Sequence, residues 1–396
     1  MVIEPKTRGF ICTTAHPDGC REAVRRQIDY VKKQPRVENG PKKALIIGAS
    51  TGYGLASRIS AAWGSGAATI GIIFDKPASG NRTASAGWYN TAAFEAFAAE
   101  EGLYAKTING DAFSKEVKEQ TIALIKQDLG EVDLVIYSLA APRRTLPDGT
   151  TVSSVLKTVG AEYTNKTIDL KNNSVSEITV SPATEEEITH TIQVMGGEDW
   201  MDWMDALRAA GVLAKGAVTV AYSYIGPKVT HAIYADGSIG RAKQHLFASS
   251  KKIHEIYPDV NAYVSVNKAL VTQASAAIPI VPLYISILYK VMKEKGLHEG
   301  CIEQIYRLYH DRLYAAGGVP VDESGYIRID DYEMRPDVQL TVSELWDKVS
   351  GETVNEICDI KGYWDDFYQM FGFGFDNVDY SKDTDPAVWI PSIPNE

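Results

Sequence analysis

The chain has few of the residues that mark secreted or metal-binding proteins. Its 396 residues include only four cysteines, Cys12, Cys20, Cys301 and Cys358. They are too scattered for a disulfide framework and lack the paired spacing of a zinc site, and no HExxH motif is present, so we expect no bound metal. The N-terminal residues do not show the charged and then apolar pattern of a secretory signal, so we expect a reduced, cytoplasmic protein.

Basic runs and long apolar runs are also missing. The formal net charge is -11, and no stretch of lysine and arginine is long enough to follow the phosphates of a nucleic acid. The longest apolar stretch, 276–288, is shorter than a bilayer requires and contains two prolines. We therefore expect no nucleic-acid partner and no membrane span, and we interpret 276–288 as a buried core segment or the wall of an acyl pocket.

What is present is an ordinary globular composition with a regular alternation of elements. Short apolar runs at 44–47, 68–74, 104–108 and 133–139 alternate with helical stretches. This rhythm is typical of βαβ units, so we predict an α/β fold with a doubly wound, Rossmann-like parallel sheet. One helix should begin after Ser114, whose hydroxyl can cap it, and end at Gly130.

The rhythm is interrupted once and then resumes. Alternation of threonine and valine between residues 150 and 187 predicts an inserted β-hairpin. The later elements are helices near 199–210 and 239–256 and strands at 217–222 and 261–266. We expect one domain over 1–396, with an N-terminal extension at 1–40 and a helical substrate-side and C-terminal region at 276–396.

A glycine-rich turn directly follows the first predicted strand. It reads Gly48-Ala-Ser-Thr-Gly-Tyr-Gly54 and leads into a helix. Glycines permit a tight turn and let backbone amides approach a pyrophosphate at a helix N-terminus. The position between a buried strand and a helix indicates a dinucleotide site, with a purely structural turn as the alternative.

An acidic residue stands where the second predicted strand ends. Asp75 follows Phe74, roughly 20 residues past the glycine turn, where the dinucleotide fold places an acid that bonds the adenosine ribose. A carboxylate there favours NADH over NADPH, although Lys76 and Arg82 lie near enough in sequence to soften the preference. The alternative is a strand-end acid that faces water.

Tyr234 and Lys243 are nine positions apart. On one continuous helix, nine steps of about 100° put two side chains on opposite faces, so these two converge only if the chain turns between them. Residues 236–240, Asp-Gly-Ser-Ile-Gly, supply such a turn. A nearby ammonium would make the phenol a better acid, which is an oxidoreductase arrangement. By spacing alone, a surface tyrosine and a solvated lysine are an equal alternative.

At this point the chain resembles the trans-2-enoyl-CoA reductases, the family that includes the FabV-type enoyl-ACP reductases of the short-chain dehydrogenase/reductase superfamily. The motifs that carry the resemblance span most of the chain. They are the glycine turn, Ala86-Gly-Trp-Tyr-Asn90, Asn109-Gly-Asp-Ala-Phe-Ser114, Tyr137-Ser-Leu-Ala-Ala-Pro-Arg-Arg144, Met195-Gly-Gly-Glu-Asp-Trp200, Ala221-Tyr-Ser-Tyr-Ile-Gly-Pro227, Tyr234-x8-Lys243 and Val264-Ser-Val-Asn-Lys-Ala-Leu-Val-Thr272. The Tyr-x8-Lys spacing discriminates best, since other reductases of the superfamily have shorter spacings.

The resemblance implies a role for each matching residue. Tyr234 is the implied proton donor, Lys243 a cofactor ligand and Tyr224 a substrate contact. The residues implied to hold NADH are Gly48, Ala49, Ser50, Thr51, Gly52, Tyr53, Phe74, Asp75, Asp111, Ala112, Leu139, Ala140, Leu270, Val271 and Thr272. The family position that matches Asp75 is often glutamate, so the shorter acid leaves the strength of the NADH preference open.

The expected activity is transfer of hydride from NADH to the β-carbon of a trans-2-enoyl thioester, carried on CoA or on acyl carrier protein, in fatty acid synthesis or butyrate-type fermentation. Tyr234, aided by Tyr224, would stabilise the enolate. The alternatives are a carbonyl or alcohol reductase and a non-catalytic dinucleotide-binding protein. Arg143 and Arg144 would meet phosphates near the site or form structural ion pairs, and the resemblance implies a monomer.

Overall fold

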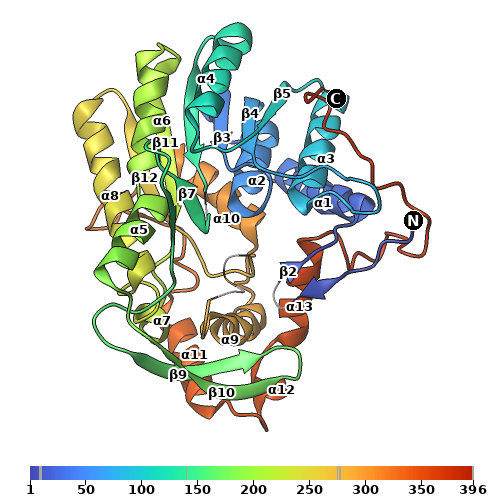
Figure 1. Ribbon diagram of the computed structural model, residues 1–396, viewed down its shortest axis with the longest axis vertical. Coiled ribbons are helices and arrows are strands. Elements are labelled where there is room, and N and C mark those ends of the chain that lie inside the picture. Colours follow the sequence, from blue (N-terminus) through green and yellow to red (C-terminus); the bar gives the residue numbers. More distant parts are fainter. Residues whose placement is uncertain (9–10, 140, 274, 276–277, 395–396) are drawn as a thin grey trace.

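A seven-stranded parallel sheet is the centre of the computed structural model, which describes residues 1–8, 11–139, 141–273, 275 and 278–394 (Figure 1). Its strand order is β13-β12-β11-β6-β3-β4-β5. The strands are β3 (Lys43–Ile47), β4 (Ala68–Ile73), β5 (Ala105–Asn109), β6 (Val132–Tyr137), β11 (Leu213–Ser223), β12 (Asn261–Val266) and β13 (Ile327–Arg328). The predicted doubly wound fold is confirmed, and the early apolar runs are strands β3 to β6.

The strand order changes direction between β3 and β6. From β3 the chain adds β4 and then β5 on one side, and it returns to place β6 against the other side of β3. In open parallel sheets this switch point leaves a crevice outside the carboxyl ends of the strands, where ligands bind. Ligand-binding residues are therefore expected in the loops that follow β3, β4, β6, β11 and β12.

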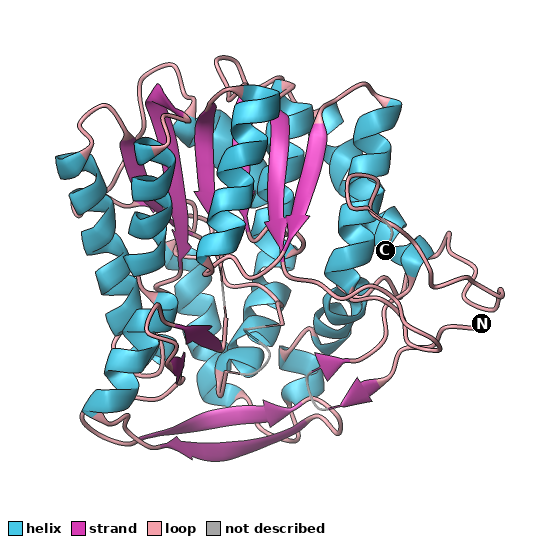
Figure 2. Ribbon diagram, turned by 45° about the horizontal axis from the view of Figure 1, so that its top comes forward, coloured by secondary structure: helices cyan, strands magenta, loops and turns pink. Residues whose placement is uncertain are grey.

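Helices cover both faces of the sheet (Figure 2). Successive residues of β3 point to opposite faces, so Ala44 and Ile46 enter one buried cluster while Leu45 and Ile47 enter the other. The first cluster includes residues of α1 (Pro17–Lys33), α2 (Gly52–Ile59), α3 (Ala86–Glu100), α9 (Val281–Glu294) and α10 (Cys301–Arg307). The second includes α4 (Lys115–Leu124), α6 (Glu198–Ala209) and α8 (Ser238–Ile256).

The helix predicted after Ser114 is present and begins and ends as expected. The Ser114 hydroxyl accepts a hydrogen bond from the Val117 amide at 3.2 Å, which caps α4. The helix continues as the π-helical segment η2 (Ile125–Leu129), and Gly130 follows it with a φ of 80°. A residue with a side chain rarely adopts that backbone conformation, so glycine is suited to this end.

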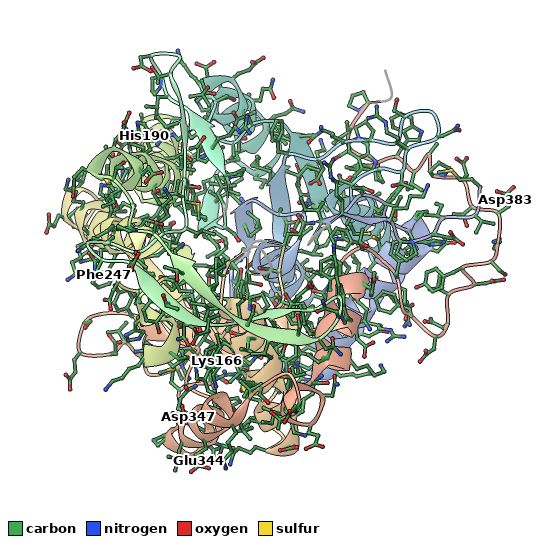
Figure 3. The ribbon with its side chains drawn as sticks, turned by 60° about the horizontal axis from the view of Figure 1, so that its bottom comes forward. Lys166, His190, Phe247, Glu344, Asp347 and Asp383 are labelled. Atoms are coloured by element: carbon green, nitrogen blue, oxygen red, sulfur yellow. The ribbon has the colours of Figure 1, made fainter. Side chains whose placement is uncertain are left out.

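The predicted insertion contains an antiparallel hairpin, β9 (Tyr163–Asp169) and β10 (Ser174–Val180). It crosses the molecule beside α9, α11 (Pro336–Lys348) and α12 (Val354–Ile357) (Figure 1). Lys166 reaches from the hairpin to the end of α11, where its ammonium donates to the carbonyls of Trp346 at 2.8 Å and Asp347 at 3.1 Å (Figure 3). These carbonyls lack partners within the helix, so the lysine caps it.

The C-terminal segment of the chain packs against α3. The Trp88 indole donates to the Val388 carbonyl at 2.7 Å, and Tyr89 donates to the Pro386 carbonyl at 2.8 Å.

The other elements are β1 (Thr7–Arg8), β2 (Ile11–Cys12), β7 (Arg143–Thr145), β8 (Thr151–Ser153), α5 (Glu185–Met195), α7 (Lys228–His231), α13 (Ile360–Gln369), and the π-helical segments η1 (Ser60–Ser65) and η4 (Leu308–Leu313).

From residue 278 onwards, the apolar stretch 276–288 is buried except at Pro279, which is half-buried. Residues 276–277 lie outside the described part, and the remainder leads into α9, where Leu283 and Ile287 are fully buried. Ile280 precedes α9 with a φ of 73°, a rare conformation for a β-branched residue. Among the described residues, no helix is both long and apolar enough to cross a membrane.

Candidate active site

The residues singled out from the sequence follow the carboxyl ends of adjacent strands. Gly48 follows β3, Phe74 follows β4, Leu139 lies just beyond β6, Tyr224 follows β11, and Leu270 to Thr272 lie just beyond β12. Because these strands are parallel neighbours, the loops meet at one edge of the sheet. The motifs scattered along the sequence are thus brought to the switch point. Ala140 lies outside the described residues.

Two glycines of the turn between β3 and α2 are packed too closely for a side chain. A Cβ on Gly48, whose φ is 86°, would collide with the carbonyl of Ser138 after β6, and one on Gly54 would collide with the carbonyl of Gly48. Helix α2 begins at Gly52, and Thr51 before it makes no side-chain hydrogen bond to the first amides. Those amides are therefore directed at the crevice and available to an anion.

Asp75 is joined to the glycine turn and to the loop that follows it. The Ser85 hydroxyl donates to Asp75 Oδ1 at 2.7 Å, and the Ser50 side chain also bonds this carboxylate. Burial raises the pKa of Asp75, and these two hydroxyls partly oppose that shift. Beside it, the Phe74 ring is 79% exposed, an unusual position for a large apolar side chain. No ion pair joins Asp75 to Lys76 or Arg82 within the described residues.

The residues that follow β5 are held in place by hydrogen bonds to backbone groups. Asp111 Oδ1 accepts from the Phe113 amide at 3.0 Å and forms the turn that leads into α4. The Ala112 side chain is buried, and its carbonyl accepts from the Trp203 indole at 3.1 Å. Leu139 is half-buried and lies against Gly48. Asp111 and Ala112 thus follow β5, while Leu139 follows β6 on the other side of β3.

The turn predicted between Tyr234 and Lys243 is present. Gly240 packs so tightly on the preceding turn that a Cβ would collide with the Ala235 carbonyl. Helix α8 begins at Ser238, which places Lys243 in its second turn, and the Lys243 ammonium donates to the Tyr222 carbonyl at 3.0 Å. The two predicted residues therefore both lie beside the end of β11.

Burial shifts the pKa values of Lys243 and Tyr234 in the directions that favour their uncharged forms. It lowers the pKa of Lys243 to about 8 and raises the pKa of Tyr234 to about 12. Desolvation is the cause of the Tyr234 shift, and the expected acidifying effect of Lys243 on the phenol is not among its causes. With this pKa, Tyr234 keeps its proton at neutral pH and can donate a hydrogen bond.

Tyr224 links Tyr234 to a buried carboxylate that the sequence analysis missed. The Tyr224 and Tyr234 rings meet edge to face, with centroids 4.8 Å apart. The Tyr224 hydroxyl donates to Glu333 Oε1 at 3.0 Å, and the Tyr284 hydroxyl donates to the same oxygen at 2.6 Å. Glu333 is fully buried, and its other oxygen accepts from the Ala269 amide at 2.7 Å. No local pattern around Glu333 separates it from the other acids of residues 330–337.

Tyr53 and the loop after β12 are held together by a second set of contacts. The Tyr53 hydroxyl donates to the Lys268 carbonyl at 2.8 Å and accepts from the Gln304 amide at 3.1 Å. Lys268 is 2% exposed, its ammonium lies 4.9 Å from the centre of the Tyr289 ring, and burial lowers its pKa to about 8. The Val271 amide donates to the Tyr289 hydroxyl at 3.1 Å. The glycine turn and residues 270–272 thus face one crevice.

Of the two arginines after β6, Arg144 forms the ion pairs of one interpretation, while contact of Arg143 with phosphates stays a prediction. Arg144 is buried and pairs with Glu198 at 2.6 Å and Asp202 at 3.3 Å, so it is a structural ion pair. Arg143 is exposed on β7. In the part of the chain that the structure describes, no group of three or more His, Cys, Asp or Glu residues is arranged to hold a metal ion.

Three family models match the chain in succession. The trans-2-enoyl-CoA reductase catalytic region matches residues 82–314. The NAD(P)H binding domain of trans-2-enoyl-CoA reductase matches residues 2–80, and a model described as an enoyl reductase FAD binding domain matches residues 321–384. The first of these alone covers more than half of the chain.

Within residues 321–384, the start of α13 and the side chains of Arg328 and Arg335 are already paired, so they offer no site for a flavin dinucleotide. FAD carries a pyrophosphate, which needs free amides at a helix start or unpaired basic groups. Here the start of α13 is occupied by Asp359, which accepts from the Gly362 amide at 2.9 Å. Arg328 is paired with Asp330 at 2.6 Å, and Arg335 with Asp337 at 2.9 Å. No step of the chemistry below depends on a flavin.

Curated relatives align along the whole chain. An enoyl-[acyl-carrier-protein] reductase [NADH] from Cytophaga hutchinsonii is 60% identical over 99% of this chain and 100% of the relative. A trans-2-enoyl-CoA reductase [NADH] from Ruminiclostridium cellulolyticum is 57% identical over the same shares.

Solved structures agree with this. The Treponema denticola trans-2-enoyl-CoA reductase in complex with NAD has a TM-score of 0.95 and 48% identity, and the Clostridium acetobutulicum enzyme in complex with NADH has a TM-score of 0.95 and 45% identity. Both comparisons cover 100% of each chain. With the geometry of the crevice, these matches confirm the resemblance seen in the sequence: the chain belongs to the trans-2-enoyl-CoA reductase family.

Proposed function

We propose that this chain reduces trans-2-enoyl thioesters to saturated acyl thioesters with NADH. The observation that carries the proposal is the meeting of the glycine turn, Tyr224, Tyr234 and Lys243 at one edge of a parallel sheet. The names of the relatives support it, since they include NADH-dependent reductases of both enoyl-CoA and enoyl-acyl carrier protein.

The residues at this edge of the sheet support a dinucleotide site. The turn leaves no room for a Cβ at Gly48 or Gly54, and the first amides of α2, which Thr51 does not cap, would bind the pyrophosphate. Asp75 would bond the adenosine ribose, and the exposed ring of Phe74 would be covered by the adenine. Asp111, Ala112, Leu139 and Ala140 would line the adenine side, and Leu270, Val271 and Thr272 would close over the nicotinamide end.

Bound NADH would supply the hydride for the β-carbon of the enoyl group. As negative charge develops on the thioester oxygen, Tyr234 would donate its hydroxyl hydrogen and stabilise the enolate. Lys243, held at the end of β11, would bind the ribose of the cofactor. Tyr224 would contact the substrate beside Tyr234.

The proposal also covers the carrier of the thioester, the cellular setting and the assembly state. Either CoA or acyl carrier protein would present the thioester through the same phosphopantetheine arm. A reducing, cytoplasmic setting is supported by the four cysteines, all of which are free. We propose that the chain acts as a monomer, as the resemblance implies. We also propose that it forms one domain, which is supported by a buried cluster that includes residues from α1, the sheet, α9 and α13.

The test follows NADH absorbance with purified protein and crotonyl-CoA. Parallel reactions contain NADPH in place of NADH, or a ketone of matched length in place of crotonyl-CoA. Loss of NADH that depends on crotonyl-CoA is the expected result. Loss with the ketone alone would assign the chain to the carbonyl reductases, and no loss with either would favour a non-catalytic dinucleotide-binding protein.

A further inference from the structure

The carboxylate of Glu333 lies at the centre of a closed hydrogen-bond group behind the proposed active site. Oε1 accepts the hydroxyls of Tyr224 at 3.0 Å and Tyr284 at 2.6 Å, and Oε2 accepts the Ala269 amide at 2.7 Å. A fully buried carboxylate is costly unless such donors surround it. Burial raises the pKa of Glu333, while the Tyr284 hydroxyl, the Lys268 charge and the Ala269 amide oppose that shift. The group joins the ends of β11 and β12 to α9.

Tyr224 and Tyr234 differ in whether the hydroxyl hydrogen is available to the substrate. A tyrosine hydroxyl carries one hydrogen, and that of Tyr224 is directed at Glu333. Tyr224 therefore presents only lone pairs to a substrate oxygen, so it is not a second donor to the enolate. Tyr234 makes no hydrogen bond through its hydroxyl to any described residue, which leaves its hydrogen free for the substrate.

The Tyr234 ring depends on Tyr224 for its orientation. The two rings are nearly perpendicular, at 82°, with centroids 4.8 Å apart, an arrangement that aromatic pairs favour. Tyr224 is in turn fixed at its far end by Glu333. The chain of contacts runs from the buried acid through one ring to the other.

We infer that Glu333 is a positioning residue for the reduction: it holds Tyr224 through its hydroxyl, and the Tyr224 ring orients Tyr234 so that Tyr234 alone donates to the thioester oxygen. This inference rests on the function proposed above. It assigns Tyr224 a role in orientation in place of the direct donation to the enolate expected from the sequence.

A double-mutant cycle tests the inference. Glu333→Gln, Tyr224→Phe and the double variant are compared with the wild type by kcat with crotonyl-CoA at saturating NADH. Each single variant should lose on the order of 10- to 100-fold in kcat, since small misplacements of reacting groups have effects of this size. KM for NADH should stay within about twofold, and the double variant should be no slower than the slower single variant, because both changes break the same contact.

Two further variants separate positioning from general damage to the core. Glu95→Gln alters another buried acid, which accepts from the Thr107 and Ser392 hydroxyls, and it should lower the melting temperature while kcat is unchanged. If Glu333→Gln does not fold, the cycle is repeated with Glu333→Asp, which keeps the charge but shortens the reach.

Different results would overturn the role of Glu333 and the proposed function. An active wild type whose losses multiply in the double variant overturns the inference and leaves the proposed function intact. The same holds if Glu333→Gln folds and keeps the wild-type kcat. A wild type that does not oxidise NADH with crotonyl-CoA overturns the proposed function and the inference together.

Discussion

The ammonium of Lys243 lies 3.0 Å from the main-chain carbonyl of Tyr222 and donates a hydrogen bond to it. The lysine is therefore held at the carboxyl end of β11, where its ammonium is largely removed from water. Burial lowers its pKa to about 8, so near neutral pH the protein carries a charge whose removal from water opposes folding. A cofactor ribose in the crevice would give this ammonium a further partner.

Tyr234→Phe is expected to lose most of the turnover. The change removes the one hydrogen that we assign to the developing oxyanion, and loss of such a donor lowers kcat by about 10²–10³. NADH binding should be nearly unchanged, since the phenol does not hold the cofactor. The two quantities are measured by crotonyl-CoA-dependent NADH oxidation and by fluorescence titration with NADH. A variant with wild-type kcat would remove Tyr234 from the mechanism.

Lys243→Met is expected to weaken NADH binding and at the same time to stabilise the fold near pH 7. The folded pKa of about 8 lies below the ordinary value of 10.5, so the unfolded chain binds more protons between these two pH values. The cost of the buried charge is therefore fully present below pH 8 and is relieved as pH rises towards 10.5.

The comparison is made by urea unfolding of wild type and variant at pH 7 and pH 10. The variant should be the more stable protein at pH 7, and its advantage should shrink at pH 10. A variant that is less stable than wild type at pH 7 would show that Lys243 contributes to the fold through contacts that outweigh its desolvation.

Gly54→Ala is expected to disrupt the glycine turn. A Cβ at Gly54 would overlap the carbonyl of Gly48, so the turn must shift, at a cost of about 1–3 kcal/mol in the free energy of unfolding. NADH affinity should fall with it, because the amides at the start of α2 move. Gly317→Ala is the matched control, since a Cβ there meets no atom within 4 Å, and it should change stability by less than about 0.5 kcal/mol.

Asp75→Ser is expected to reduce discrimination against NADPH. The carboxylate would repel a 2′-phosphate, and removing this like-charge contact should lower the ratio of kcat/KM for NADH over NADPH on the order of tenfold. Ser85→Ala is a useful companion, since it removes only the hydroxyl that donates to Asp75. A ratio that stays at the wild-type value in Asp75→Ser would place the specificity elsewhere in the crevice.

Much of the fold could be predicted because its signals are local. The parallel strands are buried on both faces and therefore appear as continuous apolar runs, as in residues 44–47. The Ser114 cap and the Gly130 end depend on residues within one helix. The glycine turn and the turn before Lys243 are likewise contained in short segments.

The parts of the site that were missed depend on contacts between distant segments. Glu333 meets Tyr224 across 109 positions of sequence, and Gln304 meets Tyr53 across 251. The direction of the Tyr224 hydrogen follows from Glu333, so its role could not be read from its own motif. The acidifying effect expected of Lys243 was wrong for the same reason, since desolvation by surrounding segments decides both pKa values.

The partners of the β9–β10 hairpin also affect how the chain can assemble. Lys166 bonds carbonyls 180 and 181 positions later, and the Trp364 indole bonds the Leu170 carbonyl from 194 positions away. During synthesis the apolar face of the hairpin, including Ile168 and Leu170, must wait for α11 and α13 to emerge from the ribosome. Such late, non-local closure slows folding and leaves this apolar face exposed to water on the nascent chain.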